Sequence, residues 1–266
     1  MTPGQHADAA AALWQAEQSG QQLGLLSRQY PGMTMDDAYA VQAALVEKRR
    51  AAGRKVIGWK IGLTSRAMQQ ALNIDIPDSG VLMDDMLFET GGEVPAGRFI
   101  QPRIEAEIAF VMKAPLAGSD VTRDDVIAAT DYVVPSLEIL DTRILRADPE
   151  TGQARIITDT IADNAANAGL VLGHERHAVD AFDLRWVGAI VSRDGAVEET
   201  GLGAGVLNDP IEGIVWLARR MDEYGQRIEA GQVILSGSFI RPLEAPAGSL
   251  IEADFGLFGR VAIRFG

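Results

Sequence analysis

Two glutamates in the segment Arg103–Met112 have the spacing that most directly suggests chemistry. Glu105 and Glu107 alternate with apolar residues, a pattern that predicts a β-strand with one buried face. Because side chains on a strand point to alternate faces, the two carboxylates would share a face, with Cα atoms about 7 Å apart. That separation allows both to bind one cation. A solvated strand face is the alternative interpretation.

A third glutamate, Glu138, lies in the apolar run 133–140. A carboxylate buried in such a run is unfavourable unless it is paired or ligated. With the first two glutamates it would supply three oxygen ligands, which suit a hard divalent cation such as Mg²⁺ or Mn²⁺. The alternative is an ion pair between Glu138 and an arginine such as Arg103 or Arg143.

A lysine and an aspartate upstream are further candidates. Lys60 lies between glycines in the segment 58–65, within an expected short strand, where it could face an anionic ligand. A surface lysine is the alternative. Asp78 follows a proline and has the sequence context of a turn aspartate.

Two polar segments could contribute to a binding site. Residues 236–239 could supply hydroxyl or backbone N–H groups, or form a strand with a glycine bulge. Residues 159–169 precede an expected strand and form either a loop of the site or a capped turn. Two other kinds of site are disfavoured. The glycines at 201–205 lack the third glycine of a dinucleotide-binding motif, and the three histidines do not have the spacing of a zinc-protease motif.

Charge and composition exclude several classes of protein. The 266 residues include 24 Lys and Arg against 37 Asp and Glu, a formal net charge of −13, which disfavours binding to nucleic acid and to anionic membranes. The absence of cysteine excludes disulfides, thiolate nucleophiles and cysteine-ligated metals. We find neither a signal-peptide pattern nor an apolar run of the roughly 18 residues that a membrane span requires. We therefore expect a cytoplasmic protein with no membrane association.

Apolar periodicity divides the chain into two regions of one expected catalytic domain, residues 1–266. Residues 1–53 are predicted to be helical, with helices over 9–26 and from Thr34 to Gly53. Residues 54–266 are predicted to form a β-rich core that includes a helix over 211–221. Strands and helices do not alternate regularly, so the sequence predicts an α+β fold with a helical N-terminal part packed on a mixed, mostly antiparallel β core. The expected strands are 56–63, 103–112, 132–140, 169–172, 184–192, 196–200, 232–239 and those within 249–265.

Several of these segments resemble the fumarylacetoacetate-hydrolase superfamily, in its hydratase and decarboxylase branch. Segment 58–65, the run 104–107 and Glu138 carry the resemblance to the superfamily. Longer similarities, which narrow it to the branch, lie at 36–42, 148–151, 163–169, 198–201 and 235–239. The similarity extends from residue 30 to residue 264. Trp59 and Ser79 stand where the most similar members are expected to have His and Tyr.

The resemblance implies a metal centre with catalytic side chains beside it. It assigns Mg²⁺ or Mn²⁺ to Glu105, Glu107 and Glu138, and it places Lys60 and Asp78 next to the metal. In the implied mechanism, Lys60 balances the charge of an anionic substrate and Asp78 moves a proton or orients the water.

The resemblance also implies further contacts and an assembly. Ser238, Asn164 and Arg103 are the residues it suggests for substrate binding. The implied fold is a mixed β-sandwich roll, and the implied assembly is a homo-oligomer based on a pentamer, up to a decamer.

The implied reaction is metal-dependent addition of water to the small dicarboxylate 2-oxo acid 2-oxohept-4-ene-1,7-dioate, giving 4-hydroxy-2-oxoheptanedioate in homoprotocatechuate (4-hydroxyphenylacetate) catabolism. Its distal carboxylate needs a cation, for which Arg103, Arg143 and Arg241 are available. Hydration of 2-hydroxypenta-2,4-dienoate and decarboxylation of 2-oxohex-3-enedioate are alternatives within the branch. A metal-binding partner subunit of a decarboxylase complex is the non-enzymatic alternative. Hydrolysis of an acylpyruvate is disfavoured, because no histidine and glutamate stand out as a pair that could activate water.

Overall fold

Capped helices begin the chain in the computed structural model, which describes residues 1–66, 69–70 and 76–266. α1 (Pro3–Ser19) and α3 (Met35–Ala51) each start with a capping box, in which a threonine side chain accepts from the backbone N–H three residues on. The second predicted helix is confirmed within two residues. The first, over 9–26, is wrong at both ends, because Gly20 adopts φ +69° and ends α1 before the short α2 (Leu26–Gln29) begins.

The larger sheet in the described part of the chain has eight strands. Its order is β2-β1-β10-β5-β6-β7-β3, and β11 pairs with the start of β5. The strands are β1 (Val56–Gly62), β2 (Asp78–Met83), β3 (Leu87–Glu89), β5 (Arg103–Met112), β6 (Thr130–Leu140), β7 (Asn167–Leu172), β10 (Val233–Leu235) and β11 (Leu243–Glu244).

The smaller sheet has five strands in the order β4-β13-β12-β8-β9. These are β4 (Glu93–Val94), β8 (Gly188–Arg193), β9 (Ala196–Leu202), β12 (Leu250–Asp254) and β13 (Arg260–Phe265). Among the strand pairs of both sheets in the described residues, those of β1 with β10, β3 with β7 and β4 with β13 are parallel and the others antiparallel. The prediction of a mixed, mostly antiparallel β core is therefore confirmed.

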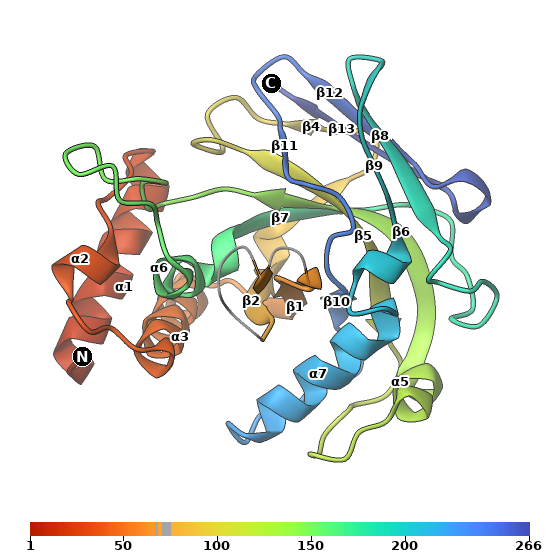
Figure 1. The fold of residues 1–266 in the computed structure, drawn as a ribbon, viewed down its shortest axis with the longest axis horizontal. Helices are drawn as coiled ribbons and strands as arrows, with labels where there is room; N and C mark the ends of the chain where they lie inside the picture. Colours follow the sequence, from red (N-terminus) through yellow and green to blue (C-terminus); the bar gives the residue numbers. More distant parts are fainter. Residues whose placement is uncertain (67–68, 71–75) are drawn as a thin grey trace.

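The apolar face of β5 joins the two sheets. Ile104, Ala106 and Ile108 are fully buried in a core that also contains Val261 and Ile263 of β13. Figure 1 shows the smaller sheet above the larger one, with α5 (Arg123–Ala129) and α7 (Pro210–Asp222) below. This packing explains why the alternation along β5 is so regular: one face meets the other sheet, and the other face is left for polar residues.

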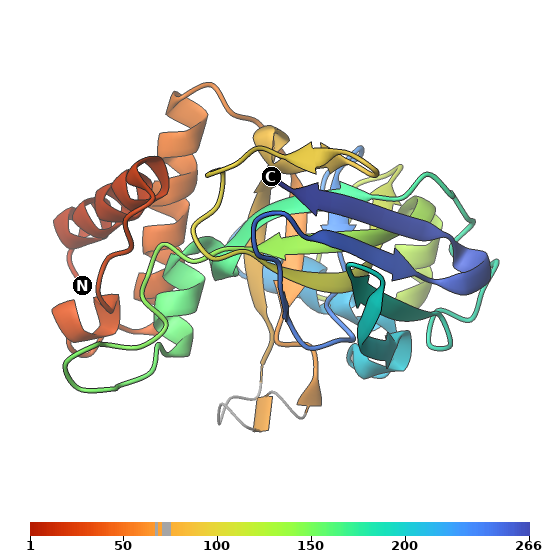
Figure 2. The same cartoon turned by 90° about the horizontal axis from the view of Figure 1, so that it is seen from above.

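The N-terminal helices lie to one side of the sheets, as Figures 1 and 2 show. Their core is shared with α6 (Ile157–Ala162), since Ile161 packs with Leu13, Val41 and Leu45. A segment from the middle of the chain thus ties the helical part to the β-rich part. The expectation of a single catalytic domain stays a prediction. None of the described helices combines the length and the apolar character needed to cross a lipid bilayer.

A left-handed turn connects α6 to β7. Asn164, Ala165 and Ala166 have φ of +53°, +51° and +58°, a conformation that is uncommon for residues other than glycine. The Asn164 side chain binds β2 by accepting from the Val81 N–H at 2.8 Å and donating to the Val81 C=O at 2.9 Å. The turn therefore holds β2 against β7 through a single amide.

Three parts of the fold differ from the sequence prediction. Asp78 begins β2 instead of lying in a turn. The strand expected over 232–239 is only β10, because the chain leaves the sheet at Gly237, where φ is +117°. Helices α5 and α6 were not predicted.

We expect Asn164→Ala to lower the free energy of unfolding by about 2–4 kcal/mol, because it leaves both buried backbone groups of Val81 without partners. Urea unfolding followed by circular dichroism measures this. Asn208→Ala is the control, since Asn208 also has a positive φ of +73° but is exposed. Equal losses in the two variants would show that the hydrogen bonds to Val81 do not stabilise the turn.

Candidate active site

The register between β5 and β6 brings the three glutamates together. Glu105 lies directly opposite Glu138, and Glu107 lies two pairs further along, opposite Ser136. One carboxylate oxygen from each glutamate lies within 4.8 Å of the others. Glu107 and Glu138 are completely buried. The interpretation of this strand face as solvated is therefore wrong.

Two of these carboxylates are each held by one oxygen only. Glu107 Oε2 accepts from the Gly237 N–H at 2.7 Å, and Glu138 Oε1 accepts from Asn167 Nδ2 at 2.7 Å. Their other oxygens, Glu107 Oε1 and Glu138 Oε2, are buried without a hydrogen-bond partner in the described part of the chain. Buried polar atoms are normally satisfied, so two unpartnered oxygens in one carboxylate cluster fit a divalent cation.

Lys60 and Asp78 reach the same face from β1 and β2. Lys60 Nζ lies 3.6 Å from Glu138 Oε1, and Asp78 is paired in register with Gly62. A Cβ atom at Gly62 would lie 2.2 Å from Asp78 Oδ1 and 2.8 Å from Lys60 Nζ. Glycine at this position therefore leaves the space in which the two charged side chains approach each other.

Burial controls the protonation of the cluster. Burial first, and then repulsion from Glu138, raise the pKa of Glu105 to about 8, and the same causes raise the pKa of Glu107 well above its usual value. Burial also raises the pKa of Asp78, against the opposing effect of the Lys60 charge. For Lys60 itself, burial would lower the pKa, but Glu138 and the other carboxylates raise it. Lys60 is thus a cation at neutral pH, and the Asp78 carboxyl keeps its proton to a higher pH than an exposed aspartate does.

The other expected substrate-binding residues already have partners within the protein. The Asn164 amide binds Val81, and Ser238 Oγ donates to the Ile240 C=O at 2.9 Å. Arg103 donates to Glu244 Oε1 through Nε at 2.7 Å, although its side chain shares the face of Glu105. Whether they also contact a substrate stays a prediction.

The remaining arginines considered for the distal carboxylate lie in two different environments. Arg143 is buried and paired with Asp163, and Arg241 pairs with Glu199 while its side chain is 82% exposed. Among the residues that the structure describes, neither Arg103, which pairs with Glu244, nor Arg143 pairs with Glu138, so the ion pairs considered in place of a metal site are absent there. Glu138 instead contacts Lys60 and Asn167.

Sequence reasoning missed two residues that hold the cluster. The Asn167 amide and the Gly237 N–H each bind one oxygen of a glutamate. Asn167 belongs to the polar segment 159–169, where only its hydrogen-bonding side chain could have drawn attention to it. Gly237 belongs to the segment 236–239, which was expected to supply hydroxyl or backbone N–H groups, but the sequence did not indicate that its N–H would bind Glu107.

The two departures from the family pattern lie behind the cluster. Alternation along β1 and β2 directs Trp59 and Ser79 away from the face of Lys60 and Asp78. Both line a cavity of about 340 Å³ between α3 and α7. The two side chains therefore belong to the packing behind the site and not to the face that carries the carboxylates.

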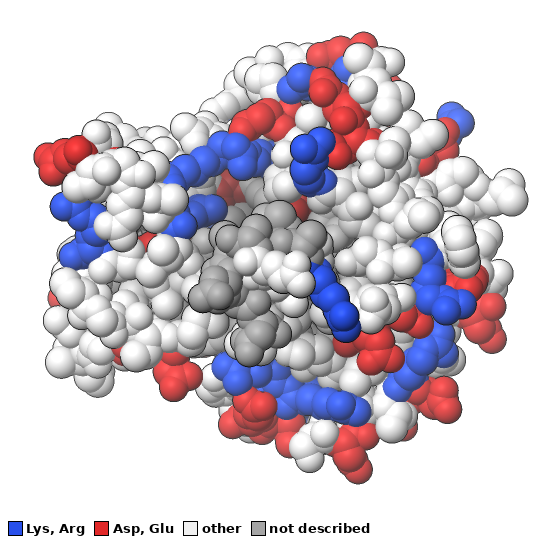
Figure 3. Space-filling model, viewed as in Figure 1, with Lys and Arg blue, Asp and Glu red and all other residues white. Residues whose placement is uncertain are grey.

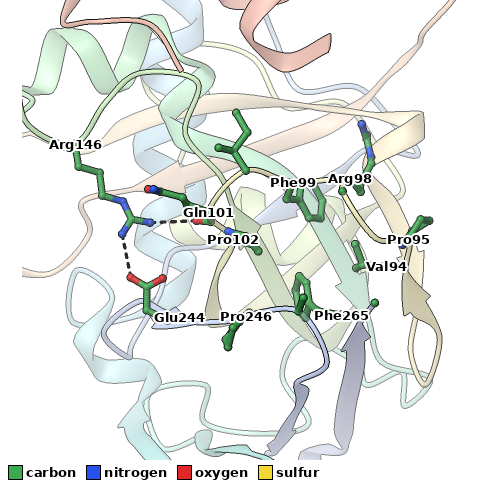
Figure 4. A pocket seen from close by; sticks show the side chains of 15 residues that line it. Val94, Pro95, Arg98, Phe99, Gln101, Pro102, Arg146, Glu244, Pro246 and Phe265 are labelled. Carbon is green, nitrogen blue, oxygen red and sulfur yellow. Dashed lines mark hydrogen bonds and ion pairs between the residues drawn. The ribbon is translucent and has the colours of Figure 1, made fainter. Parts of the chain in front are cut away.

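A second cavity, of about 520 Å³, is also separate from the cluster. It is lined by residues 94–95, 97–102, 244–247 and 265–266 and by Arg146, and Figure 4 shows Phe99, Pro246 and Phe265 at its walls. Arg146 donates to Glu244 Oε1 at 2.9 Å and to the Gln101 C=O at 3.1 Å.

On the face seen in Figure 3, Lys and Arg side chains gather around the centre, although the whole chain has a net charge of −13.

Comparisons with known proteins place this arrangement in a family, although the chain matches no protein-family model. It is 49% identical over 260 residues to a 2-oxo-hept-4-ene-1,7-dioate hydratase of Escherichia coli, covering 98% of this chain and 97% of that protein. It is 40% identical over 265 residues to a 2-keto-4-pentenoate hydratase of Paraburkholderia xenovorans, covering 100% of this chain and 96% of that one.

Comparison with solved structures leads to the same family. The 4-oxalocrotonate decarboxylase from Pseudomonas putida G7, complexed with magnesium and adipate, superimposes with a TM-score of 0.94 at 33% identity, covering 100% of this chain and 99% of that chain. The chain belongs to the fumarylacetoacetate-hydrolase superfamily, in its hydratase and decarboxylase branch. A fumarylacetoacetate hydrolase family protein of Yersinia pestis shares the fold more distantly, with a TM-score of 0.57 at 16% identity over 78% of this chain and 92% of that chain. The resemblance inferred from the sequence is thereby confirmed, as is the expectation of an enzyme with this α+β fold.

For this superfamily member, we expect Mg²⁺ to stabilise the folded protein more at pH 8.5 than at pH 6. Without metal, the folded state binds protons at Glu105 and Glu107 that the unfolded chain releases above about pH 4.5. The stability of the metal-free protein therefore falls as pH rises from about 4.5 towards 8. A cation must displace those protons, so it binds better at high pH.

Thermal unfolding of chelator-treated protein, with and without MgCl₂ at each pH, measures the effect. NaCl at matched ionic strength is the control. A Mg²⁺-induced rise in Tm that is equal or smaller at pH 8.5 would contradict the assignment of the raised pKa values to the cation site.

We expect Gly62→Ala to reduce activity by more than about 100-fold, because the new Cβ would overlap Asp78 Oδ1 and displace it from Lys60. Gly24→Ala is the control, since a Cβ there meets no atom within 4 Å. Initial rates with the dienol substrate, together with the Tm of each variant, separate displacement from unfolding. A folded Gly62→Ala enzyme with full activity would show that the two side chains need not approach so closely.

Proposed function

We propose that this chain is a divalent-metal-dependent hydratase that adds water to 2-oxohept-4-ene-1,7-dioate, or its 2-hydroxy-2,4-diene tautomer, to give 4-hydroxy-2-oxoheptanedioate. The observation that carries the proposal is the face shared by Glu105, Glu107, Glu138, Lys60 and Asp78, on which three carboxylate oxygens, one each of Glu107, Glu138 and Asp78, have no hydrogen-bond partner among the described residues. The similarity to the Escherichia coli hydratase supports the reaction and the seven-carbon substrate.

In this proposal the three glutamates hold Mg²⁺ or Mn²⁺. When bound, the cation supplies Lewis acidity to the C1 carboxylate and C2 oxygen of the substrate. The Lys60 ammonium, kept protonated by the surrounding carboxylates, offsets negative charge that develops on the C2 oxygen. Because Lys60 is buried, this interaction is weakly screened by water.

Asp78 moves the protons. Its carboxyl group gives a proton to C5 of the dienol and is reprotonated from the 2-hydroxyl, which leaves a 2-oxo-3-ene. In the second step, Asp78 gives a proton to C3 as water adds at C4. The water then loses a proton to Asp78, which leaves the hydroxyl group on C4. Burial raises the pKa of this carboxyl, which makes it a stronger base than an exposed aspartate and lets it keep its proton to a higher pH.

The proposal extends to the setting of the enzyme. By resemblance to its family, we assign it to homoprotocatechuate (4-hydroxyphenylacetate) catabolism in the cytoplasm. The same resemblance supports a homo-oligomer based on a pentamer, up to a decamer.

Decarboxylation of 2-oxohex-3-enedioate is a second candidate, favoured by the TM-score of 0.94 with the Pseudomonas putida decarboxylase. Both reactions develop negative charge at the same C2 oxygen, so the cluster serves either. Release of CO₂ by the purified enzyme would favour decarboxylation, whereas loss of diene absorbance without CO₂ would favour hydration.

We expect Glu107→Gln to lower kcat/KM by more than about 100-fold, because even partners outside the ligand shell commonly contribute 10- to 100-fold. The assay follows loss of diene absorbance after chelation and re-addition of Mg²⁺. Glu252→Gln, on an exposed position of β12, is the control and should retain activity. Full Mg²⁺-dependent activity in folded Glu107→Gln would refute the proposed metal site.

A further inference from the structure

The segment 146–155 folds back on itself beside the end of β6. The Arg155 N–H donates to the Arg146 C=O at 2.9 Å, and Ala147 and Ala154 form an isolated bridge. Asp148 closes the loop by accepting from the Thr151 N–H at 2.9 Å, and it also pairs with Arg28. The backbone on both sides of Arg155 is therefore fixed.

Among the described residues, the Arg155 guanidinium has no carboxylate in direct contact, unlike neighbouring arginines, although Asp163 and Asp159 act on it at longer range. Arg103 and Arg146 both pair with Glu244, and Arg143 pairs with Asp163. Arg155 Nη1 donates at 2.5 Å to the hydroxyl of Thr142, and no carboxylate in the described part of the chain lies within 4 Å of its guanidinium. Its side chain is not fully exposed, and burial lowers the pKa of the group. Placing a cation in such surroundings is unfavourable unless an anion joins it.

Arg155 also lies within reach of the carboxylate cluster. Thr142 is four residues beyond Glu138, so even a fully extended chain would separate their Cα atoms by at most about 14 Å. The Arg155 charge acts on the site, since burial raises the pKa of Asp78 and Arg155 is one of the groups that oppose this rise. Arg155 and the carboxylate cluster are therefore neighbouring parts of the molecule.

We propose that Arg155 binds the distal carboxylate of the substrate and so selects dicarboxylate over monocarboxylate 2-oxo acids. This inference rests on the proposed function. A guanidinium presents parallel N–H groups that match a carboxylate in a two-bond pair. With Nη1 on Thr142, the Nη2 and Nε edge remains for the ligand. A monoacid would leave this cation without a partner, which is the arrangement that gives the strongest discrimination between substrates.

Arg155→Gln tests the proposal with two substrates. We expect kcat/KM for the seven-carbon dienol diacid to fall about 50-fold, and kcat/KM for 2-hydroxypenta-2,4-dienoate to change by less than about threefold. Arg146→Gln is the matched control, because Arg146 lies across the same loop with its guanidinium on Glu244; it should leave both substrates unaffected. Equal losses on both substrates, or no loss on the diacid, would overturn the proposal.

A binding measurement separates this proposal from the proposed reaction. In the presence of Mg²⁺, calorimetry with the unreactive 2-oxoheptanedioate and 2-oxopentanoate should show that Arg155→Gln weakens only the diacid, by about 50-fold. If the wild-type enzyme turned over neither dienol, the proposed function would fail, and this comparison would still test Arg155. Arg155→Lys serves if the glutamine variant does not fold, since it keeps the charge and removes the paired N–H groups; an unchanged preference for the diacid in that variant would refute the two-bond pair.

Discussion

Mutual repulsion among three buried carboxylates is the constraint that shapes the site. Two unit charges at the separation found within this cluster repel by about 3–4 kcal/mol at an effective dielectric constant of about 20. The protein offsets this with the Lys60 ammonium and with one hydrogen bond each to Glu107 and Glu138. In the metal-free protein, protons neutralise the remaining negative charge of the cluster. In the form that we propose to be active, a cation does so. Burial, and after it this repulsion, raise the pKa values of Glu105 and Glu107, and the same repulsion would favour the cation that we propose.

The hydrogen bonds to Glu107 and Glu138 determine which of their carboxylate oxygens remain available to a ligand. A carboxylate can rotate, and a free one would present either oxygen, but the Gly237 N–H and the Asn167 amide each hold a particular oxygen. Both donors come from positions where the backbone leaves regular structure: Gly237 has φ +117°, and Asn167 follows the left-handed turn of Asn164, Ala165 and Ala166. Uncommon backbone conformations at a functional site are thus explained here by the donors that they place.

Much of the fold could be predicted where a pattern is local. The bounds of β5 match their prediction because its alternation is uninterrupted, and that alternation also put Glu105 and Glu107 on one face. Asp78 was misread because Pro77 and Gly80 resemble turn residues, whereas its strand is stabilised by pairing with β1. Asn167 and Arg155 could not be found from spacing, because their roles depend on the β6–β7 register and on a loop that returns to the end of β6. The resemblance to the family supplied Lys60 and Asp78, which composition and periodicity alone left ambiguous.

The position of β10 in the larger sheet has a consequence for how the protein is made. β10 is formed by residues 233–235, yet it lies between β1, which carries Lys60, and β5, which carries two of the glutamates. During synthesis the glutamates of β5 and β6 emerge and can pair early, but Lys60 cannot take its place in the sheet until β10, which begins 173 residues after Lys60 (233 − 60), has been inserted. Contacts between such distant segments form slowly, because a long loop must close first. The pair of strands that carries the glutamates can therefore form before Lys60 joins it, and the charge balance of the site is complete only once β10 has entered the sheet.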